Sequence, residues 1–400
     1  MIQHFIDDLV GVTWESQRQK IGSIYPPLLL LFLFCSLILQ NTTISTRSAY
    51  ITIAIVYGVI SLYFSIYIHQ VKIVNKFYIL WFLLFASLIL FRTLFNPVLG
   101  DVVRLLALLT FTTANLIILP QVFSFRQFCL IGSRLGAFLV VLGFLPYFGL
   151  SFGIGFIDVS LWGSQLYWYP SLQPMMSVFV NPNQLGSFAL FATIASLYEW
   201  KTDRSSYTTL ILVLNLLGLA FSNYRTGWIA LLAALAIYVV YTKLGREFMT
   251  LAVISGFSSL LIAFLMMFNV FPGPEFLTEV SLNNRRELWT TSILALQERP
   301  FFGYNFTGVV DIVGNPHNSY LRMFSAFGLF GGCLYSILSL GIPISATRQA
   351  TTDSQVILAM LLVSFVFVQI FNSLSFVGVA MRSSIIALLM GYSITATHPD

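Results

Sequence analysis

Three residues outside the apolar runs, Arg225, Arg285 and His317, could do chemistry in an otherwise apolar sequence. Hydrophobic residues make up 58% of the chain and charged residues 9%, so few side chains can bind an ion or move a proton. A guanidinium is permanently charged and matches two phosphate oxygens at once. A neutral imidazole accepts a proton near neutral pH. These residue types favour a site for an anionic group, beside which a neutral histidine could accept a proton.

Two of the three residues lie in residues 272–332, the longest interval without a continuous apolar run. The two asparagines before Arg285 can cap a helix by accepting from its unpaired N–H groups. Arg285 and Trp289, four residues apart, then share one face of that helix, with apolar residues such as Leu294 behind them. Pro300 ends the helix, because the residue before a proline is pushed out of the α region.

His317 is expected at the start of the next helix, after a turn at Asn315–Pro316 and before a cap at Asn318 or Ser319. The positive end of a helix dipole disfavours imidazolium, which favours a neutral acceptor. A lone histidine at a membrane interface is also commonly a hydrogen-bonded bystander, and the residues alone leave both readings open. Further turns are expected at three glycines: Gly303, Gly308 and Gly314.

The elements that must position these residues are membrane helices. A mean hydropathy of +0.86 with many uninterrupted apolar runs predicts an all-α polytopic membrane protein. We expect about twelve spans, with a large loop between spans nine and ten. They lie near residues 24–39, 49–68, 77–95, 102–119, 128–148, 176–198, 207–222, 228–242, 248–271, 319–346, 356–375 and 379–396. This reading divides one integrated domain into an N-terminal bundle (1–271), a catalytic loop (272–318) and C-terminal helices (319–400).

Lysine and arginine are distributed differently across these spans. If both termini are cytoplasmic, all five lysines fall on the inner side. Many arginines then fall on the outer side: Arg47, Arg92, Arg104, Arg225, Arg285, Arg286, Arg299, Arg322 and Arg382. Any one of them could snorkel to lipid headgroups or pair with Asp101, Glu287 or Asp311. As a set, they favour an anionic ligand at the outer face.

Four further patterns lie near the ends of spans. Asp101 and Arg104 are three residues apart and can pair on one helix face. Residues 149–175 are rich in glycine and aromatic residues, typical of an interfacial belt, although flat aromatics also bind sugar faces. The amides in Asn181–Gly186 are expected to break an apolar helix. The short turn at Ser222–Gly227 holds Arg225 close to the membrane, where a cation needs an anion.

Metal and cofactor chemistry is not expected. The three cysteines are scattered in apolar spans without metal-ligand spacing. The net charge of +5 suits an anionic membrane surface, and nothing indicates a nucleic-acid partner.

Several short motifs together resemble the O-antigen ligase / O-antigen polymerase family of bacterial membrane glycosyltransferases. They are Ser222–Trp228, Asn284–Trp289, Glu298–Tyr304, His317–Leu321 and Phe327–Gly331. Their order, the outer loop and the span count agree with that family. The chain departs from the pattern at Asn284, where a glycine is usual, and at Arg286, which occupies a position that is often apolar.

The resemblance implies transfer of a glycan from a polyprenyl-pyrophosphate carrier to a hydroxyl acceptor, lipid or glycan, at the outer side of the inner membrane. Arg225 and Arg285 would contact the pyrophosphate, and His317 would be the base. Eight further residues complete the candidate set as substrate-binding residues: Arg286, Arg322, Arg382, Arg104, Asn181, Asn183, Trp289 and Asn318.

Two other classes of protein stay open. A secondary transporter or flippase suits the span count, but no carboxylate lies in the middle third of any expected span, where ion-coupled transport commonly uses one. A non-catalytic assembly partner would not need an arginine-lined outer site.

Overall fold

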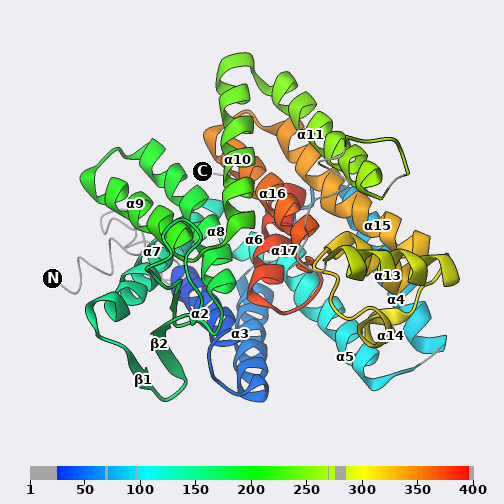
Figure 1. Cartoon of the computed structure of the whole chain (residues 1–400), viewed down its shortest axis with the longest axis horizontal. Helices are drawn as coiled ribbons and strands as arrows, with labels where there is room; N and C mark the ends of the chain where they lie inside the picture. The colour runs from blue at the N-terminus through cyan, green and yellow to red at the C-terminus, as the bar shows by residue number, and fades with distance from the viewer. Residues whose placement is uncertain (1–24, 68–70, 96, 269, 275–284, 396–400) are drawn as a thin grey trace. The chain divides into compact units, whose positions relative to one another are not determined.

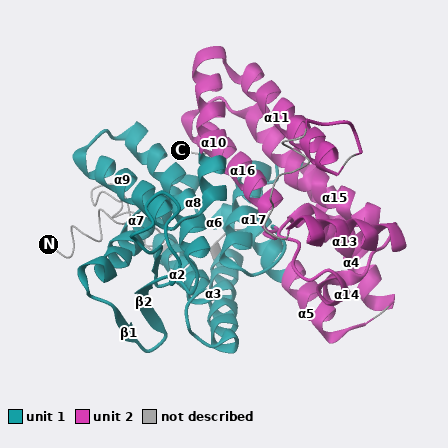
Figure 2. Cartoon of the chain, viewed as in Figure 1, with its two compact units in different colours: residues 1–75, 110–231, 376–400 teal, residues 76–109, 232–375 magenta. Residues whose placement is uncertain are grey.

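The structure of the chain, a computed structural model, is built mainly from helices (Figure 1). It describes residues 25–67, 71–95, 97–268, 270–274 and 285–395. The chain divides into two compact units (Figure 2). Unit 1 comprises residues 1–75, 110–231 and 376–400, and unit 2 comprises residues 76–109 and 232–375.

Unit 1 holds most of the helices before residue 231 and the last helix of the chain. Its elements are α2 (Tyr25–Leu39), α3 (Thr46–Tyr67), η3 (Ala114–Ile118), α6 (Leu119–Val122), α7 (Phe125–Phe144), η4 (Leu145–Phe148), β1 (Phe152–Ile154), β2 (Ile157–Leu161), β3 (Met175–Ser177), α8 (Pro182–Thr202), α9 (Ser206–Phe221) and α17 (Met381–Ile394). Two elements run from one unit into the other: η2 (Leu108–Thr112) and α10 (Arg225–Leu244).

The core of unit 1 forms around α8. Its residues from 185 to 196 are all buried, as expected of a helix that is apolar all round. The neighbouring helices α7 and α9 approach it closely at small residues. A Cβ added at Gly136 of α7 would lie 2.5 Å from the Cβ of Ala192 and 2.5 Å from Oδ1 of Asn215 on α9. The glycine is therefore what allows these three helices to meet.

Unit 2 carries the segment expected to hold the chemistry. Its elements are α4 (Lys76–Phe95), α5 (Leu99–Ala107), α11 (Arg246–Met267), α13 (Arg285–Glu298), α14 (Asn305–Ile312), α15 (Ser319–Gln349) and α16 (Asp353–Phe371). α13 and α14 both pack against α15, and α14 also packs against α5. The short helices between residues 285 and 312 are thus held by longer ones.

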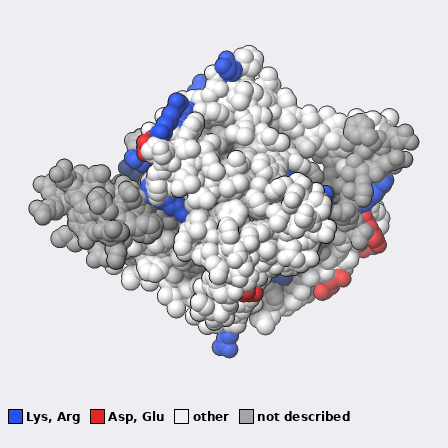
Figure 3. Space-filling view, turned by 60° about the vertical axis from the view of Figure 1, so that its left-hand side comes forward, with Lys and Arg blue, Asp and Glu red and all other residues white. Residues whose placement is uncertain are grey.

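Eight helical stretches in the described residues are long and apolar enough to cross a membrane. They are Thr46–Ile66, Lys76–Phe95, Leu99–Val122, Phe125–Phe148, Arg225–Leu244, Arg246–Met267, Ser319–Gln349 and Asp353–Phe371. On the face seen in Figure 3, uncharged residues predominate. The helices confirm a mainly helical, multi-pass architecture. α2, α9 and α17 are shorter apolar helices, so the count of twelve spans stays a prediction.

The expectation of an all-α protein is wrong between residues 149 and 177. Three antiparallel strands form a small sheet in the order β1-β2-β3. The sheet is held to α7, because the Ser177 hydroxyl donates to the carbonyl oxygen of Leu139 at 2.6 Å. The helix at the place of the sixth expected span, α8, begins at Pro182 instead of residue 176. Its amides do not break a helix: Asn181 caps it and Pro182 occupies its first turn.

Two local expectations in unit 2 are also wrong. Leu294 is 53% exposed, and the buried face of α13 is formed by Trp289, Ser292 and Ala295. Gly308 does not mark a turn but lies within α14. The expected end of α13 before Pro300 is confirmed, since the helix ends at Glu298. The asparagines at 283 and 284 lie outside the described residues.

Candidate functional site

The turn before α15 gives His317 a defined backbone. The side-chain oxygen of Asn315 accepts from the backbone N–H of His317 at 3.1 Å. Asn318 is the N-cap of α15, because its side-chain oxygen accepts from the N–H of Leu321 at 3.0 Å. Between these two residues, His317 has a φ of +50°, in the left-handed region that residues other than glycine rarely adopt. Such strain persists where surrounding contacts fix it, commonly at functional sites.

Trp289 of α13 supplies one of those contacts. Its indole N–H donates to the carbonyl oxygen of Pro316 at 2.6 Å. The ring is 1% exposed and packs against Phe264 and Phe268 of the α11 segment, with ring centroids 5.5 and 6.3 Å away. Trp289 was expected to bind substrate, but its buried ring and paired N–H make it a support for the His317 turn.

Arg285 lies one helical turn before Trp289 and acts electrostatically on His317. Partial burial lowers the pKa of the His317 imidazole, and the positive charge of Arg285 lowers that pKa further. His317 is nevertheless exposed to solvent at its edge, where a ligand could reach it. α13 therefore fixes the turn through Trp289, and Arg285 adds to the lowering of the His317 pKa that burial produces.

The crossing of two backbone segments fixes α13 against α15. The N–H of Tyr304 donates to the carbonyl oxygen of Ser325 at 3.0 Å, and the N–H of Leu329 donates to that of Pro300 at 2.6 Å. A Cβ at Gly303 would lie 2.5 Å from the backbone of Ala326, and one at Gly328 would lie 2.2 Å from the backbone of Phe301. Both glycines also have positive φ. Only glycine permits this crossing.

The arginines of unit 2 fall into two kinds. Arg92 donates to the carbonyl oxygen of Gly303 at 3.0 Å, and the Arg299 guanidinium lies 4.4 Å from the ring centre of Tyr304. Both therefore support the crossing. Arg286 is exposed on α13.

Arg104 and Arg322 behave differently. Arg104 lies 5.7 Å from the ring centre of Phe306, and its Nη1 is buried without a hydrogen-bond partner among the described residues. Arg322 lies close enough to Arg104 for the two positive charges to repel. The expected pair between Asp101 and Arg104 is not formed. Asp101 instead accepts from the N–H and the hydroxyl of Thr307, each at 2.9 Å.

Unit 1 holds the other expected site residues. The Arg225 guanidinium carbon lies 3.0 Å from the ring centre of Tyr167. Arg382, at the start of α17, donates to the Ser187 hydroxyl at 3.4 Å and interacts electrostatically with Tyr224. The Asn181 side chain is used as a helix cap, since it accepts from the N–H of Asn183 at 2.8 Å.

The turn before Arg225 packs on the beginning of α8. A Cβ added at Gly186 would lie 2.3 Å from Cβ of Tyr224 and 2.6 Å from Oγ of Ser222. The structure thus gathers Arg225, Arg382 and the first turn of α8 within unit 1. Within unit 2 it gathers a second set: Arg104, Arg285, Arg322, Trp289, His317 and Asn318.

Sequence reasoning missed several supporting residues. Asn315 was assigned only to a turn, although an asparagine two residues before a constrained position is a common way to hold the backbone. Thr307 carried no sequence signal, and Tyr167 was expected only as part of an aromatic belt, because the partners of both residues are far away in the chain.

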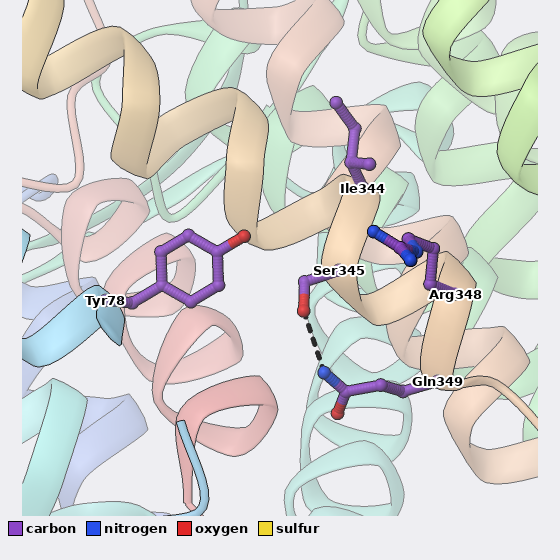
Figure 4. A pocket seen from close by; sticks show the side chains of 5 residues that line it. All are labelled: Tyr78, Ile344, Ser345, Arg348 and Gln349. Carbon is purple, nitrogen blue, oxygen red and sulfur yellow. Dashed lines mark hydrogen bonds between the residues drawn. The ribbon is translucent and has the colours of Figure 1, made fainter. Parts of the chain in front are cut away.

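A cavity of about 370 Å³ also lies in unit 2, lined by Tyr78, Ile344, Ser345, Arg348 and Gln349 (Figure 4). Gln349 donates to the Ser345 hydroxyl there at 2.7 Å. These α15 residues are at the opposite end of that helix from Arg322. The cavity is therefore separate from the His317 site.

Comparison with known proteins completes the description of this site. No curated protein matches the chain. A family model described as O-Antigen ligase matches residues 210–336, which contain Arg225, Arg285, His317 and Arg322. Over residues 210–336 the chain is therefore similar to the O-antigen ligase family.

Proposed function

We propose that the protein transfers a glycan from a polyprenyl-pyrophosphate carrier to a hydroxyl group of a lipid or glycan acceptor. The reaction would take place at the outer face of the bacterial inner membrane, with both termini in the cytoplasm. The family match and the apolar helices support a membrane glycosyltransferase of the O-antigen ligase type. The carrier, the acceptor and the residue roles are our proposal.

The observation that carries the proposal is the position of His317, in a fixed turn beside the permanent charge of Arg285. A general base must be unprotonated at working pH, and burial and Arg285 both lower the pKa of His317. A guanidinium at the same place can stabilise the negative charge that develops on a leaving pyrophosphate. Base and anion-binding group are therefore brought together by one helix and one turn.

In the proposed step, the acceptor oxygen attacks the anomeric carbon while His317 takes the hydroxyl proton. The new bond joins the acceptor oxygen to the sugar. The bond between the anomeric carbon and the pyrophosphate oxygen breaks, and its electron pair leaves with the pyrophosphate. A single displacement of this kind inverts the anomeric centre. Arg285 would bind the leaving group, and no step requires a metal.

Arg104 and Arg322 would bind a further negative charge of a substrate. Two partly buried guanidiniums that repel each other are costly without an anion, and a buried Nη1 of Arg104 has a free donor. Asp101 accepts twice from Thr307 and forms no ion pair with Arg104 among the described residues, so it leaves the free Nη1 of Arg104 unsatisfied. Arg225 stays a sequence-based prediction as a second pyrophosphate ligand, as do Arg382, Asn183 and Arg286 as substrate contacts.

The test uses purified protein in detergent with a lipid-linked glycan and a hydroxyl acceptor. We expect His317→Ala to lower turnover by about a hundredfold or more, the usual scale for loss of a general base, with little change in donor affinity. Arg285→Lys should also lose most activity, because an ammonium cannot form the bidentate contact. Arg246→Lys, at an exposed ion pair with Glu247, is the matched control.

The same assay separates transfer from transport. A transporter or flippase moves its substrate between two compartments and forms no new glycosidic bond, so it gives no product in detergent solution. Wild-type turnover in both His317→Ala and Arg285→Lys would refute the assigned roles.

A further inference from the structure

The loop between β2 and β3 in unit 1 borders a second cavity, with a volume of about 350 Å³. This volume lies in the range of small-ligand sites, about 300–1,000 Å³. Its lining residues include several whose side chains carry amide or hydroxyl groups: Tyr147, Ser164, Gln165, Ser171 and Gln173. None of its lining residues is charged. The cavity therefore offers hydrogen-bond donors and acceptors to an uncharged polar ligand.

The backbone around this cavity is already held in place. The N–H of Trp162 donates to the carbonyl oxygen of Pro174, and that of Leu166 donates to the carbonyl oxygen of Leu172, each at 2.9 Å. The Tyr147 hydroxyl donates to the carbonyl oxygen of Gln173 at 2.5 Å. Since these bonds exist without a ligand, little ordering is needed when one binds.

Exposed aromatic side chains surround the same loop. Trp162 is 38% exposed, Trp168 is 54% exposed and Tyr169 is 51% exposed. Trp168 also donates its indole N–H to the carbonyl oxygen of Ala220 at 3.2 Å, which ties the loop to the end of α9. A belt of aromatic residues at a membrane interface would account for these rings. It would not account for two amides and two hydroxyls around one cavity.

The loop is joined directly to Arg225. Asn223 accepts from the N–H of Tyr167 and donates to the carbonyl oxygen of Gln165, each at 3.2 Å. Asn223 itself has a left-handed backbone, with a φ of +59°. The Arg225 guanidinium lies over the Tyr167 ring. Gln165, which lines the uncharged cavity, is thus only two residues before Tyr167, whose ring contacts the Arg225 guanidinium.

From this arrangement we propose that the cavity is a sugar-binding subsite, which holds a sugar of the donor glycan while Arg225 contacts its phosphate. Sugars present uncharged hydroxyl groups, which amides and hydroxyls can bind, and an apolar face that stacks on aromatic rings. The proposal rests on the proposed function, and it assigns the position of one substrate part that the family match does not give.

The test uses free oligosaccharides of glucose, galactose, N-acetylglucosamine and rhamnose, without lipid or phosphate, as probes. Their binding is measured by saturation-transfer NMR and by the fluorescence of the tryptophans beside the loop. Gly163→Leu fills the cavity, because an added Cβ there meets no atom within 4 Å and the backbone is not left-handed. Gly153→Leu is the matched control, since it has the same open space on β1 but does not line the cavity.

We expect at least one probe to bind wild type and the Gly153→Leu control equally. Gly163→Leu and the double variant Gln165→Ala, Gln173→Ala should each weaken binding by about tenfold or more, and should raise the donor KM with little change in kcat. Unchanged probe binding in both variants would overturn the proposal. So would the absence of any probe binding in an enzyme that turns over its lipid-linked donor. Probe binding without any transfer would instead refute the proposed function and leave the subsite standing.

Discussion

Replacement of Trp289 by phenylalanine tests whether α13 controls His317 through the turn. The change keeps an aromatic ring against Phe264 and Phe268 but removes the N–H that donates to the buried Pro316 carbonyl at 2.6 Å. An unsatisfied buried carbonyl costs about 1–3 kcal/mol. The left-handed backbone of His317 costs a similar amount, about 1–3 kcal/mol. The free energy lost with the indole hydrogen bond is thus similar to the free energy needed to keep His317 in its left-handed conformation.

We therefore expect Trp289→Phe to fold, with a Tm lower by a few degrees, and to lose activity out of proportion to that change. A loss of about 1.4 kcal/mol of positioning lowers the rate tenfold, and a displacement of about 1 Å at the reacting group can cost a hundredfold. The assay is turnover of a lipid-linked glycan in detergent, with Tm measured on the same samples.

The matched control is Thr290→Ala, the next residue on α13, which is exposed and whose hydroxyl donates to the carbonyl oxygen of Arg286 within the helix. Its kcat should stay within about twofold of wild type. A folded Trp289→Phe protein with wild-type kcat would show that the turn does not depend on the indole bond, and would refute this reasoning.

Three further predictions concern charge and backbone. Activity should fall as the pH drops below the pKa of His317, which is lowered from the ordinary 6.5. Arg285→Gln should raise that pKa in a histidine NMR titration. An unchanged pKa would contradict the electrostatic contact. Gly328→Ala should destabilise the protein by about 3 kcal/mol or more, because its Cβ would lie 2.2 Å from a backbone carbon, whereas Gly256→Ala in α11, with open space, should not lower Tm. Arg322→Gln should raise the Tm of the ligand-free protein by relieving charge repulsion, yet raise the donor KM about tenfold; a lower Tm would argue against an unneutralised pair.

Features set by neighbouring residues were predictable from the sequence. The cap at Asn318, the end of α13 before Pro300 and the long apolar helices all follow from local rules, and the structure confirms them. The turn at Asn315–Pro316 was also expected. Arg285 and His317 were expected in one loop, and the structure adds that the charge of Arg285 lowers the pKa of His317.

Features that depend on distant partners were not predictable. Asp101 and Arg104 have ideal helical spacing for a pair. Thr307 instead donates twice to Asp101, and the Arg104 guanidinium lies over the ring of Phe306. The strands between residues 149 and 177 are three to five residues long, too short for their alternation to be recognised. The crossing at Gly303 and Gly328 needs two segments that only the folded chain brings together.

The break in α15 at Gly328 divides one long helix into a part that belongs to the candidate site and a part long enough to cross a membrane. Gly328 has φ +64° and ψ −163°, so the helical hydrogen-bond ladder is interrupted between the short part that carries Arg322 and the longer part that follows. The longer part has the length of a membrane helix, and such helices tilt when the bilayer is thicker or thinner than their apolar length. Residues 300–304 are bonded to α15 on both sides of the break, to Ser325 before it and to Leu329 after it. The crossing therefore sets the direction of the longer part relative to the short part that carries Arg322, so that the site and the membrane-length helix are positioned by the same backbone bonds.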